Sequence, residues 1–130
     1  MYVLDTDTLI YFFKQMGNVP TRFLQIPPQE IGIPSIVLFE LEVGIGKLSA
    51  PQKRIEQLTA VLSNVKVLPF GEREAKIAAQ IRVTLESQGQ PIGPYDTLIA
   101  ATALAENAIL VTRNTREFGR VPQLKVENWF

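Results

Sequence analysis

Three acidic residues stand at separate junctions of the expected secondary structure. Asp5 closes an apolar run, Glu40 lies early in one helical pattern, and Asp96 opens another. Carboxylates gathered from separate elements suit a pocket for a divalent cation, because hard ions such as Mg²⁺ prefer oxygen ligands. A cation held in this way can activate water for hydrolysis of a phosphodiester. We therefore interpret the pattern as that of a metal-dependent nuclease.

Asp5 lies in residues 3–8, where an apolar run ends and a helical pattern begins at once. Asp7 is the expected N-cap of this helix, with Thr6 or Thr8 able to share that role. In a structural interpretation, both aspartates are favoured by the helix dipole. In a functional interpretation, the run delivers Asp5 to the edge of a sheet, with Thr6 and Asp7 as further polar groups beside it.

Glu40 lies in a helical pattern for which Ser35 is the expected N-cap. Glu40 and Glu42 are two residues apart, about 200° around a helix, so the two carboxylates cannot both face one pocket. We favour Glu40, because Gly44 shares its face and permits close approach of another backbone or a substrate. Alternatively, both are ordinary surface glutamates of an amphipathic helix.

Asp96 follows Pro94, which presets the first turn of a helix, and precedes the almost wholly apolar run 98–105. We expect this helix to be buried, so the presence of a carboxylate in its first turn has to be explained. Stabilisation by the helix dipole is one reason and ligation of a metal is another. The two are compatible, because the dipole favours the ionised carboxylate.

A polar cluster follows the apolar run that ends at Val111. It consists of Thr112, Arg113, Asn114, Arg116 and Arg120. Thr112 and Asn114 are candidates to orient a water or a phosphate, and Arg113 and Arg116 are candidates for phosphate contacts. The alternative is a turn with a solvated, arginine-rich face.

The elements that must position these residues alternate between short apolar runs and helical patterns. We expect strands at 2–4, 31–33, 65–68, 108–111 and 124–127. Because the runs are continuously apolar rather than alternating, they predict parallel strands covered on both faces. The fold class is therefore α/β, a three-layer α/β/α domain with a central, mainly parallel sheet of four to five strands. With 130 residues and no linker, we expect one domain, residues 1–130.

The amino-acid composition excludes several kinds of catalytic site. The chain contains no His and no Cys, which excludes a zinc site of the usual ligands, a Ser/His triad and a disulfide framework. The formal net charge is zero, so attraction of phosphate has to come from local clusters or from a metal. No stretch approaches the roughly 18 apolar residues of a membrane span, and no leader is apparent. We expect a cytoplasmic protein that does not enter a membrane.

Together, these segments resemble the PIN-domain family, in particular its VapC-type toxins. The resemblance rests on residues 1–7, 40–44, 92–101 and 110–129. It implies a PIN-like fold and a Mg²⁺- or Mn²⁺-dependent endoribonuclease that cleaves transfer RNA or other structured RNA. It also implies Asp5, Glu40 and Asp96 as catalytic residues and metal ligands.

The same resemblance implies partners. These are a small cognate antitoxin protein, a second copy of the chain in a homodimer, and a larger assembly that binds DNA through the antitoxin. Two positions depart from the family pattern. Asp7 stands where Asn is frequent, and Asn114 stands where many members carry a fourth acidic residue. The apolar cluster at residues 11–13 belongs either to an interface or to the core.

Two alternatives remain from the sequence. Residues 5–8 after an apolar run also look like the opening of a haloacid-dehalogenase-type phosphatase, in which Asp5 and Asp7 would act. That family needs a further acidic pair after a later strand, and residues 108–114 supply none. The other alternative is a non-catalytic module that binds RNA or a protein, although such modules usually lose part of the acidic set.

Overall fold

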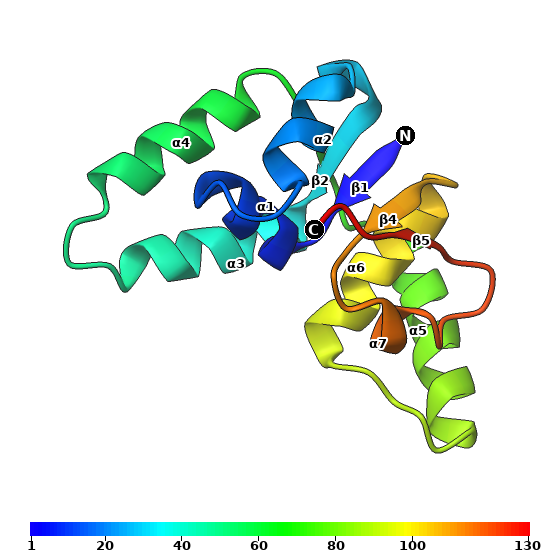
Figure 1. Ribbon diagram of the computed structural model, residues 1–130. Helices are drawn as coiled ribbons and strands as arrows, with labels where there is room; N and C mark the ends of the chain where they lie inside the picture. Colours follow the sequence, from blue (N-terminus) through cyan, green and yellow to red (C-terminus); the bar gives the residue numbers. More distant parts are fainter.

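The computed structural model describes all residues, 1–130, and shows one five-stranded sheet with helices on both faces (Figure 1). The strands are β1 (Tyr2–Leu4), β2 (Ile31–Pro34), β3 (Lys66–Leu68), β4 (Ile109–Val111) and β5 (Lys125–Glu127). The helices are α1 (Thr6–Phe13), α2 (Val19–Gln25), α3 (Ser35–Gly46), α4 (Gln52–Leu62), α5 (Glu72–Ser87), α6 (Pro94–Ala105) and α7 (Thr115–Phe118), with a 3₁₀ turn at Pro28–Glu30.

The strands lie in the order β3-β2-β1-β4-β5, and all four pairings are parallel. The central strands β1, β2 and β4 are covered on both faces, which explains why their sequences are continuously apolar. The predicted α/β class, the strand positions and the parallel sheet are therefore confirmed. Since parallel strands share their direction, the carboxyl ends of β1, β2 and β4 meet at one edge of the sheet.

The order of the strands determines the layers. The chain steps from β1 to β2 to β3 in one direction and then returns across the sheet to β4. Because parallel crossovers are right-handed, α1 to α4 lie on one face and α5 with α6 on the other. Figure 1 shows this division, with α3 and α4 projecting from the sheet and α5 packed beside α6.

Two predicted helix starts are wrong. The N-cap of α1 is Asp5, whose side chain accepts a hydrogen bond from the Thr8 amide, whereas Asp7 is exposed in the first turn. The helix begins one residue after the strand, so only Asp5 has the extended backbone that a cap requires. Ser35 is the first residue of α3, and Pro34 precedes it without a side-chain cap.

The aromatic cluster at residues 11–13 is covered by the chain itself. Phe13 is buried, Phe12 stacks on Phe23 with ring centroids 4.2 Å apart, and Tyr11 meets the edge of Phe130 at 4.9 Å. Of the two interpretations, packing within the protein accounts for these rings. None of the helices combines the length and the apolar character that crossing a bilayer requires.

Candidate active site

Asp5 occupies the edge of the sheet directly after β1. Its amide donates to the Val111 carbonyl at 3.1 Å, which extends the pairing of β1 with β4 by one residue. Its carboxylate accepts from the Thr8 amide at 2.9 Å and from the Thr112 hydroxyl. The residue is only 7% exposed. Burial raises the pKa of Asp5, and the hydrogen bonds from Thr112 and Thr8 oppose that rise.

Glu40 reaches the same region from the middle of α3. The Thr6 hydroxyl, in the first turn of α1, donates to Glu40 Oε1 at 2.7 Å, so α1 and α3 are joined beside Asp5. Glu40 is partly buried and Glu42 is exposed, as expected for residues on different faces of one helix. A Cβ placed on Gly44 would meet nothing within 4 Å, so the chain itself uses no close approach there.

Asp96 lies in the first turn of α6, with Pro94 at the helix start as predicted. Its carboxyl group shares a hydrogen bond with the carboxylate of Glu117. Burial, followed by repulsion from Glu117, Glu40 and Asp5, raises the pKa of Asp96 to about 7. The charges of Asp5, Glu40 and Glu117 therefore all act on Asp96. We call these four carboxylates the acidic cluster.

Glu117 is a member of this cluster that our sequence analysis did not identify. Its Oε1 accepts from the Gly93 amide at 3.0 Å, and its Oε2 accepts from Asn114 Nδ2 at 2.5 Å. Burial raises its pKa, but the hydrogen bonds from Gly93, Asn114 and Asp96 bring the pKa below its usual value. Glu117 is thus the ionised partner in the pair with Asp96.

A signal for Glu117 was present in the sequence. Asn114 caps α7 through its side chain, which accepts from the Glu117 amide at 3.4 Å, and Glu117 stands three residues later. An Asn followed at that spacing by Glu is the pattern of a capping box. Asn114 therefore does not replace a fourth carboxylate. Instead, Asn114 positions the carboxylate of Glu117, which lies about one helical turn further along the chain.

The charge balance of the cluster fits a divalent cation. None of Asp5, Glu40, Asp96 and Glu117 forms an ion pair with Lys or Arg. No three acidic side chains are already arranged as a closed set of metal ligands. A hydrated Mg²⁺ needs only one or two direct carboxylate ligands, because it keeps several waters. Oxygen donors with an uncompensated negative charge therefore suit such an ion.

The residues predicted to orient water or contact phosphate lie in different environments. Thr112 is fully buried, and its hydroxyl accepts from the Asn114 amide at 3.0 Å while it also contacts Asp5, so it lies within the site. Arg113 packs over the Phe130 ring, 3.7 Å from the centroid, and also over Tyr11. Asp7 and Arg116 are also exposed to solvent.

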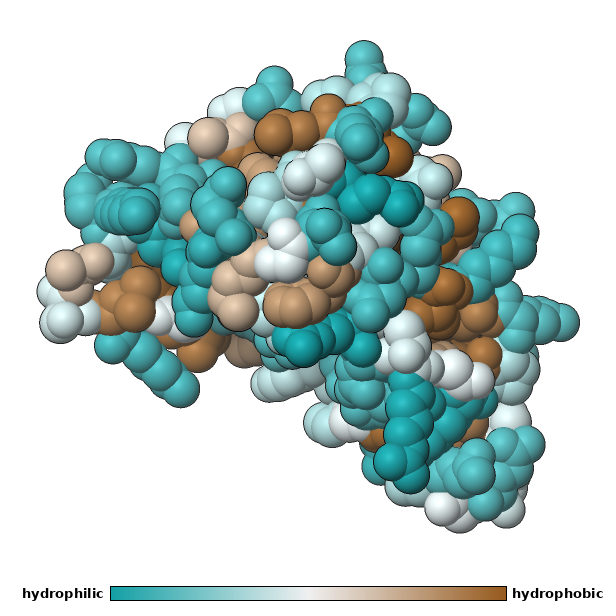
Figure 2. Space-filling model, in the orientation of Figure 1, coloured by the Kyte–Doolittle hydropathy of each residue, from teal (hydrophilic) through white to brown (hydrophobic).

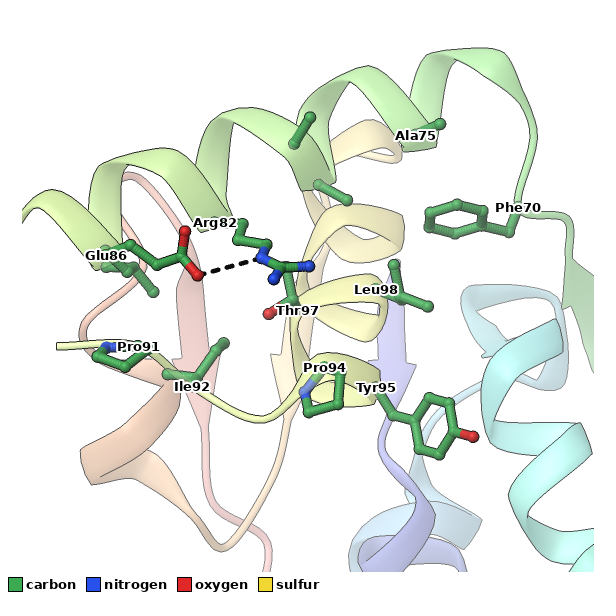
Figure 3. A pocket seen from close by; sticks show the side chains of 13 residues that line it. Phe70, Ala75, Arg82, Glu86, Pro91, Ile92, Pro94, Tyr95, Thr97 and Leu98 are labelled. Atoms are coloured by element: carbon green, nitrogen blue, oxygen red, sulfur yellow. Dashed lines mark hydrogen bonds and ion pairs between the residues drawn. The ribbon is translucent and has the colours of Figure 1, made fainter.

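A cavity of about 660 Å³ lies between α5 and α6 (Figure 3). Its walls are mainly apolar, and the Arg82–Glu86 ion pair of 3.2 Å stands at one end. Pro94 and Tyr95 at its rim directly precede Asp96. None of the four clustered carboxylates lines this cavity, so the space beside the cluster is apolar rather than acidic.

Comparisons with known proteins identify the family. The PIN domain model matches residues 2–124. The chain is 34% identical to the tRNA(fMet)-specific endonuclease VapC of Salmonella typhimurium, over 98% of this chain and 97% of that protein. It is 36% identical to ribonuclease VapC2 of Rickettsia felis, over 99% and 98%.

A solved structure agrees with these sequence matches. VapBC2 from Rickettsia felis, bound to a DNA fragment from its promoter, superposes with a TM-score of 0.92 at 35% identity, covering 99% of this chain and 98% of that one. The sheet order, the acidic cluster at its carboxyl edge and these full-length similarities agree. The chain belongs to the PIN-domain family, within its VapC group.

Proposed function

We propose that this chain is a divalent-metal-dependent endoribonuclease, with residues 1–130 forming one nuclease domain. The observation that carries the proposal is the cluster of Asp5, Glu40, Asp96 and Glu117, in which no carboxylate forms an ion pair with Lys or Arg. These carboxylates would hold Mg²⁺ or Mn²⁺. When bound, the cation supplies a water of lowered pKa and offsets charge on the phosphate.

The protein's own groups prepare the carboxylates for this task. Thr6 orients Glu40, and Thr112 with Thr8 holds Asp5. The Gly93 amide and the Asn114 side chain hold Glu117. Asp96 must lose the proton that it shares with Glu117 before both can act as ligands, and its pKa of about 7 makes this loss easy near neutral pH.

The substrate under this proposal is RNA, specifically transfer RNA or another structured RNA, as the name of the Salmonella relative suggests. Its place of action would be the cytoplasm. The activity would serve as the toxin of a toxin–antitoxin pair, held inactive by a small antitoxin protein. Related VapBC complexes that are bound to DNA, one of them to a fragment of its promoter, support an assembly that binds DNA through the antitoxin.

A homodimer also belongs to the proposal. Phe39 and Tyr95 contact each other at 5.7 Å between centroids, yet each ring is about half exposed, at 49% and 46%. Val83 on α5 is 68% exposed, and Figure 2 shows hydrophobic atoms among hydrophilic ones over the part of the molecule where α5 and α6 lie. Of these exposed apolar side chains, Tyr95 also lines the cavity between α5 and α6, and exposed apolar groups beside an apolar cavity are typical of a protein interface. A second copy would cover them.

The test is cleavage of a pool of transfer RNAs and other structured RNAs by purified, antitoxin-free protein. The reaction is run with Mg²⁺, with Mn²⁺ and with EDTA. Asp5→Asn, Glu40→Gln and Asp96→Asn should each lower the rate by at least about a hundredfold, because each removes a ligand charge from the cluster. Glu42→Gln is the matched control, since Glu42 is exposed on the same helix as Glu40.

Two outcomes would contradict the proposal. Cleavage that persists in EDTA, or that is equal in wild type and Asp96→Asn, would indicate contamination or a different site. Hydrolysis of a small phosphate ester without RNA cleavage would favour the phosphatase alternative. That alternative has little structural support, because Asp5 is held as a helix cap and Asp7 is exposed.

A further inference from the structure

A second concave site lies away from the carboxylates, where α1 and α3 end and α4 begins. It is a cavity of about 380 Å³, and its lining includes Lys14, Lys53 and Arg54 but no acidic residue. We call it the basic pocket. None of its three cations forms an ion pair. In a chain with a formal net charge of zero, such a concentration of unbalanced positive charge needs a reason.

Helix capping does not account for these cations. The carbonyls at the end of α1 already have side-chain donors, since Gln15 Nε2 donates to the Phe12 carbonyl at 2.9 Å and Gln57 Nε2 to the Phe13 carbonyl at 3.0 Å. The C-termini of α1 and α3 contribute about −0.5 charge each and the N-terminus of α4 about +0.5, so with three full positive charges the pocket keeps about 2.5 positive charges. The remainder suits an anionic ligand.

One of the three cations is already fixed in place. The Arg54 guanidinium packs over the Phe13 ring, 5.0 Å from its centroid, and Arg54 Nε donates to Gln57 at 3.1 Å. Lys14 and Lys53 are exposed, and no hydrogen bond or ion pair holds their ammonium groups. The pocket therefore combines a rigid planar cation with two free point charges, a set that suits phosphate oxygens.

The position of the basic pocket relates it to the acidic cluster. At one end, α1 and α3 are joined by the hydrogen bond between Thr6 and Glu40. At the other end, Lys14 after α1 and Leu48 after α3 both line the pocket. The two helices therefore run side by side from one site to the other (Figure 1). Eight residues of helix span about 12 Å, a distance that a single strand covers with a few nucleotides.

We propose that the basic pocket binds a backbone phosphate of the RNA substrate, a few nucleotides from the phosphate at the acidic cluster. The inference rests on the proposed ribonuclease function and extends it to substrate binding. RNA is favoured over an acidic protein segment because the pocket lies in line with the carboxylates along α1 and α3. Because the net charge of the chain is zero, the protein as a whole does not attract phosphate, and the basic pocket provides this attraction locally.

The test compares Lys14→Gln/Lys53→Gln with Lys66→Gln/Lys125→Gln. Both double variants lose two exposed lysine charges, but Lys66 and Lys125 begin β3 and β5, at the edge of the sheet opposite to the acidic cluster. For a cleavable single-stranded dodecanucleotide, the pocket variant should show KM raised about tenfold and kcat within twofold of wild type. The slope of log KM against log salt should fall by about 1.4. The control variant should match wild type.

RNA length gives a second readout. A tetranucleotide centred on the cleavage position cannot reach the pocket, so wild type and the pocket variant should cleave it equally. The inference would be overturned if wild type and the pocket variant cleaved the dodecanucleotide with the same KM and kcat. It would also be overturned if the pocket variant lost as much activity on the tetranucleotide as on the dodecanucleotide. Neither result would contradict the ribonuclease function. If only the affinity for the cognate antitoxin falls in the pocket variant, a protein occupies the pocket and the inference is also wrong.

Binding of a fluorescein-labelled dodecanucleotide in EDTA, measured by anisotropy, separates the two proposals. If wild type cleaves no RNA but binds it about tenfold more tightly than the pocket variant, the proposed function fails and the basic pocket stands as an RNA-binding site. If wild type cleaves RNA and both proteins bind equally, the pocket inference fails alone.

Discussion

The pair formed by Asp96 and Glu117 dominates the site at the scale of single residues. Two carboxyl groups that share a hydrogen bond cannot both be ionised at low cost, so one keeps its proton. Asp96 is the protonated member, because Glu117 has the Gly93 amide and the Asn114 side chain as donors. A cation held by the two carboxylates would remove this preference, because it would stabilise both negative charges.

The first prediction concerns pH. In the folded protein the pKa of Asp96 is about 7, whereas an aspartate in an unfolded chain has its ordinary pKa of 3.8, so between these values the folded state holds more protons. This group therefore makes the metal-free protein less stable as pH rises from about 4 toward 7. Metal binding releases that proton, so affinity for Mn²⁺ should rise between about pH 5.5 and 8. Urea unfolding of the metal-free protein between pH 4 and 7 measures the change in stability. Titration calorimetry in two buffers of different ionisation enthalpy measures the affinity for Mn²⁺ and the proton release.

Glu117→Gln tests the cause of this dependence. The variant removes the carboxylate that repels Asp96, so the pKa of Asp96 falls and proton release at about pH 6 decreases. If Glu117→Gln releases as many protons as wild type, the shared proton does not lie on this pair.

The second prediction concerns Thr112, whose hydroxyl serves both Asp5 and the Asn114 amide. Thr112→Val should cost about 1–3 kcal/mol of unfolding free energy, because it leaves buried polar groups unsatisfied. It should also raise the pKa of Asp5 further and weaken metal binding at neutral pH. Thr102→Val is the control, since the Thr102 hydroxyl donates only to the Leu98 carbonyl within α6. Equal activity in the two variants would refute the role of Thr112.

At the scale of elements, the short helix α7 positions Glu117 against α6. It has only four residues, too few to be stable by itself, so its cap decides whether it forms. The Asn114 side chain accepts from the Glu117 amide and donates to the Glu117 carboxylate. One residue therefore starts the helix and aims its functional side chain.

The third prediction follows from this double role. Asn114→Ala should cost about 1 kcal/mol of unfolding free energy through loss of the cap, and should lower nuclease activity because Glu117 is no longer held. Urea unfolding and metal-dependent cleavage measure the two effects. Asn64→Ala removes an exposed hydrogen bond at the end of α4 and should leave activity unchanged. An active Asn114→Ala protein would show that the carboxylate of Glu117 needs no support from α7.

The fourth prediction compares two glycines in neighbouring elements. A Cβ at Gly32 in β2 would lie 2.7 Å from Leu68 Cδ1, so Gly32→Ala should destabilise the protein by about 1–3 kcal/mol. Gly44 in α3 has open space around it, so Gly44→Ala should stabilise the protein by up to about 1 kcal/mol through helix propensity. Urea midpoints measure both. The same sign for both variants would contradict the packing described here.

At the scale of the whole molecule, unlike charges are kept apart. The acidic cluster lies at the carboxyl edge of the sheet, and the basic pocket lies at the far end of α1 and α3. The overall charge of zero conceals this separation. Because like charges crowded together oppose folding, the stability of the whole protein depends on what occupies the acidic cluster.

The fifth prediction is that a divalent cation stabilises the folded protein. At a Mg²⁺ or Mn²⁺ concentration about 100 times the Kd, the gain is about 2.7 kcal/mol, or roughly 10 °C in Tm for a domain of this size. Asp96→Asn should show a much smaller gain. Above pH 7, metal-free Asp96→Asn should melt no lower than metal-free wild type, because a repelling charge is gone. Equal metal-induced shifts in both proteins would place the cation elsewhere.

Much of this protein follows from local sequence. Strands that are buried on both faces of a parallel sheet have continuously apolar sequences, as β1, β2 and β4 do. The positions of these strands and the α/β class could therefore be predicted. Asp5 and Asp96 stood out because each lies where an apolar element meets a polar junction. Helix starts were less predictable, since a shift of one residue decided between Asp5 and Asp7 as the cap.

Other features arise only when distant segments meet. Glu117 is 21 positions from Asp96 in the chain, and no local pattern shows that α7 brings its carboxylate against the start of α6. Lys14 and Lys53 share a pocket only because α4 returns to the end of α1. Sequence alone determined the strands and the identity of the polar groups, because these depend on local burial and periodicity. Tertiary structure decided which charges interact, because electrostatic coupling depends on distance in space rather than along the chain.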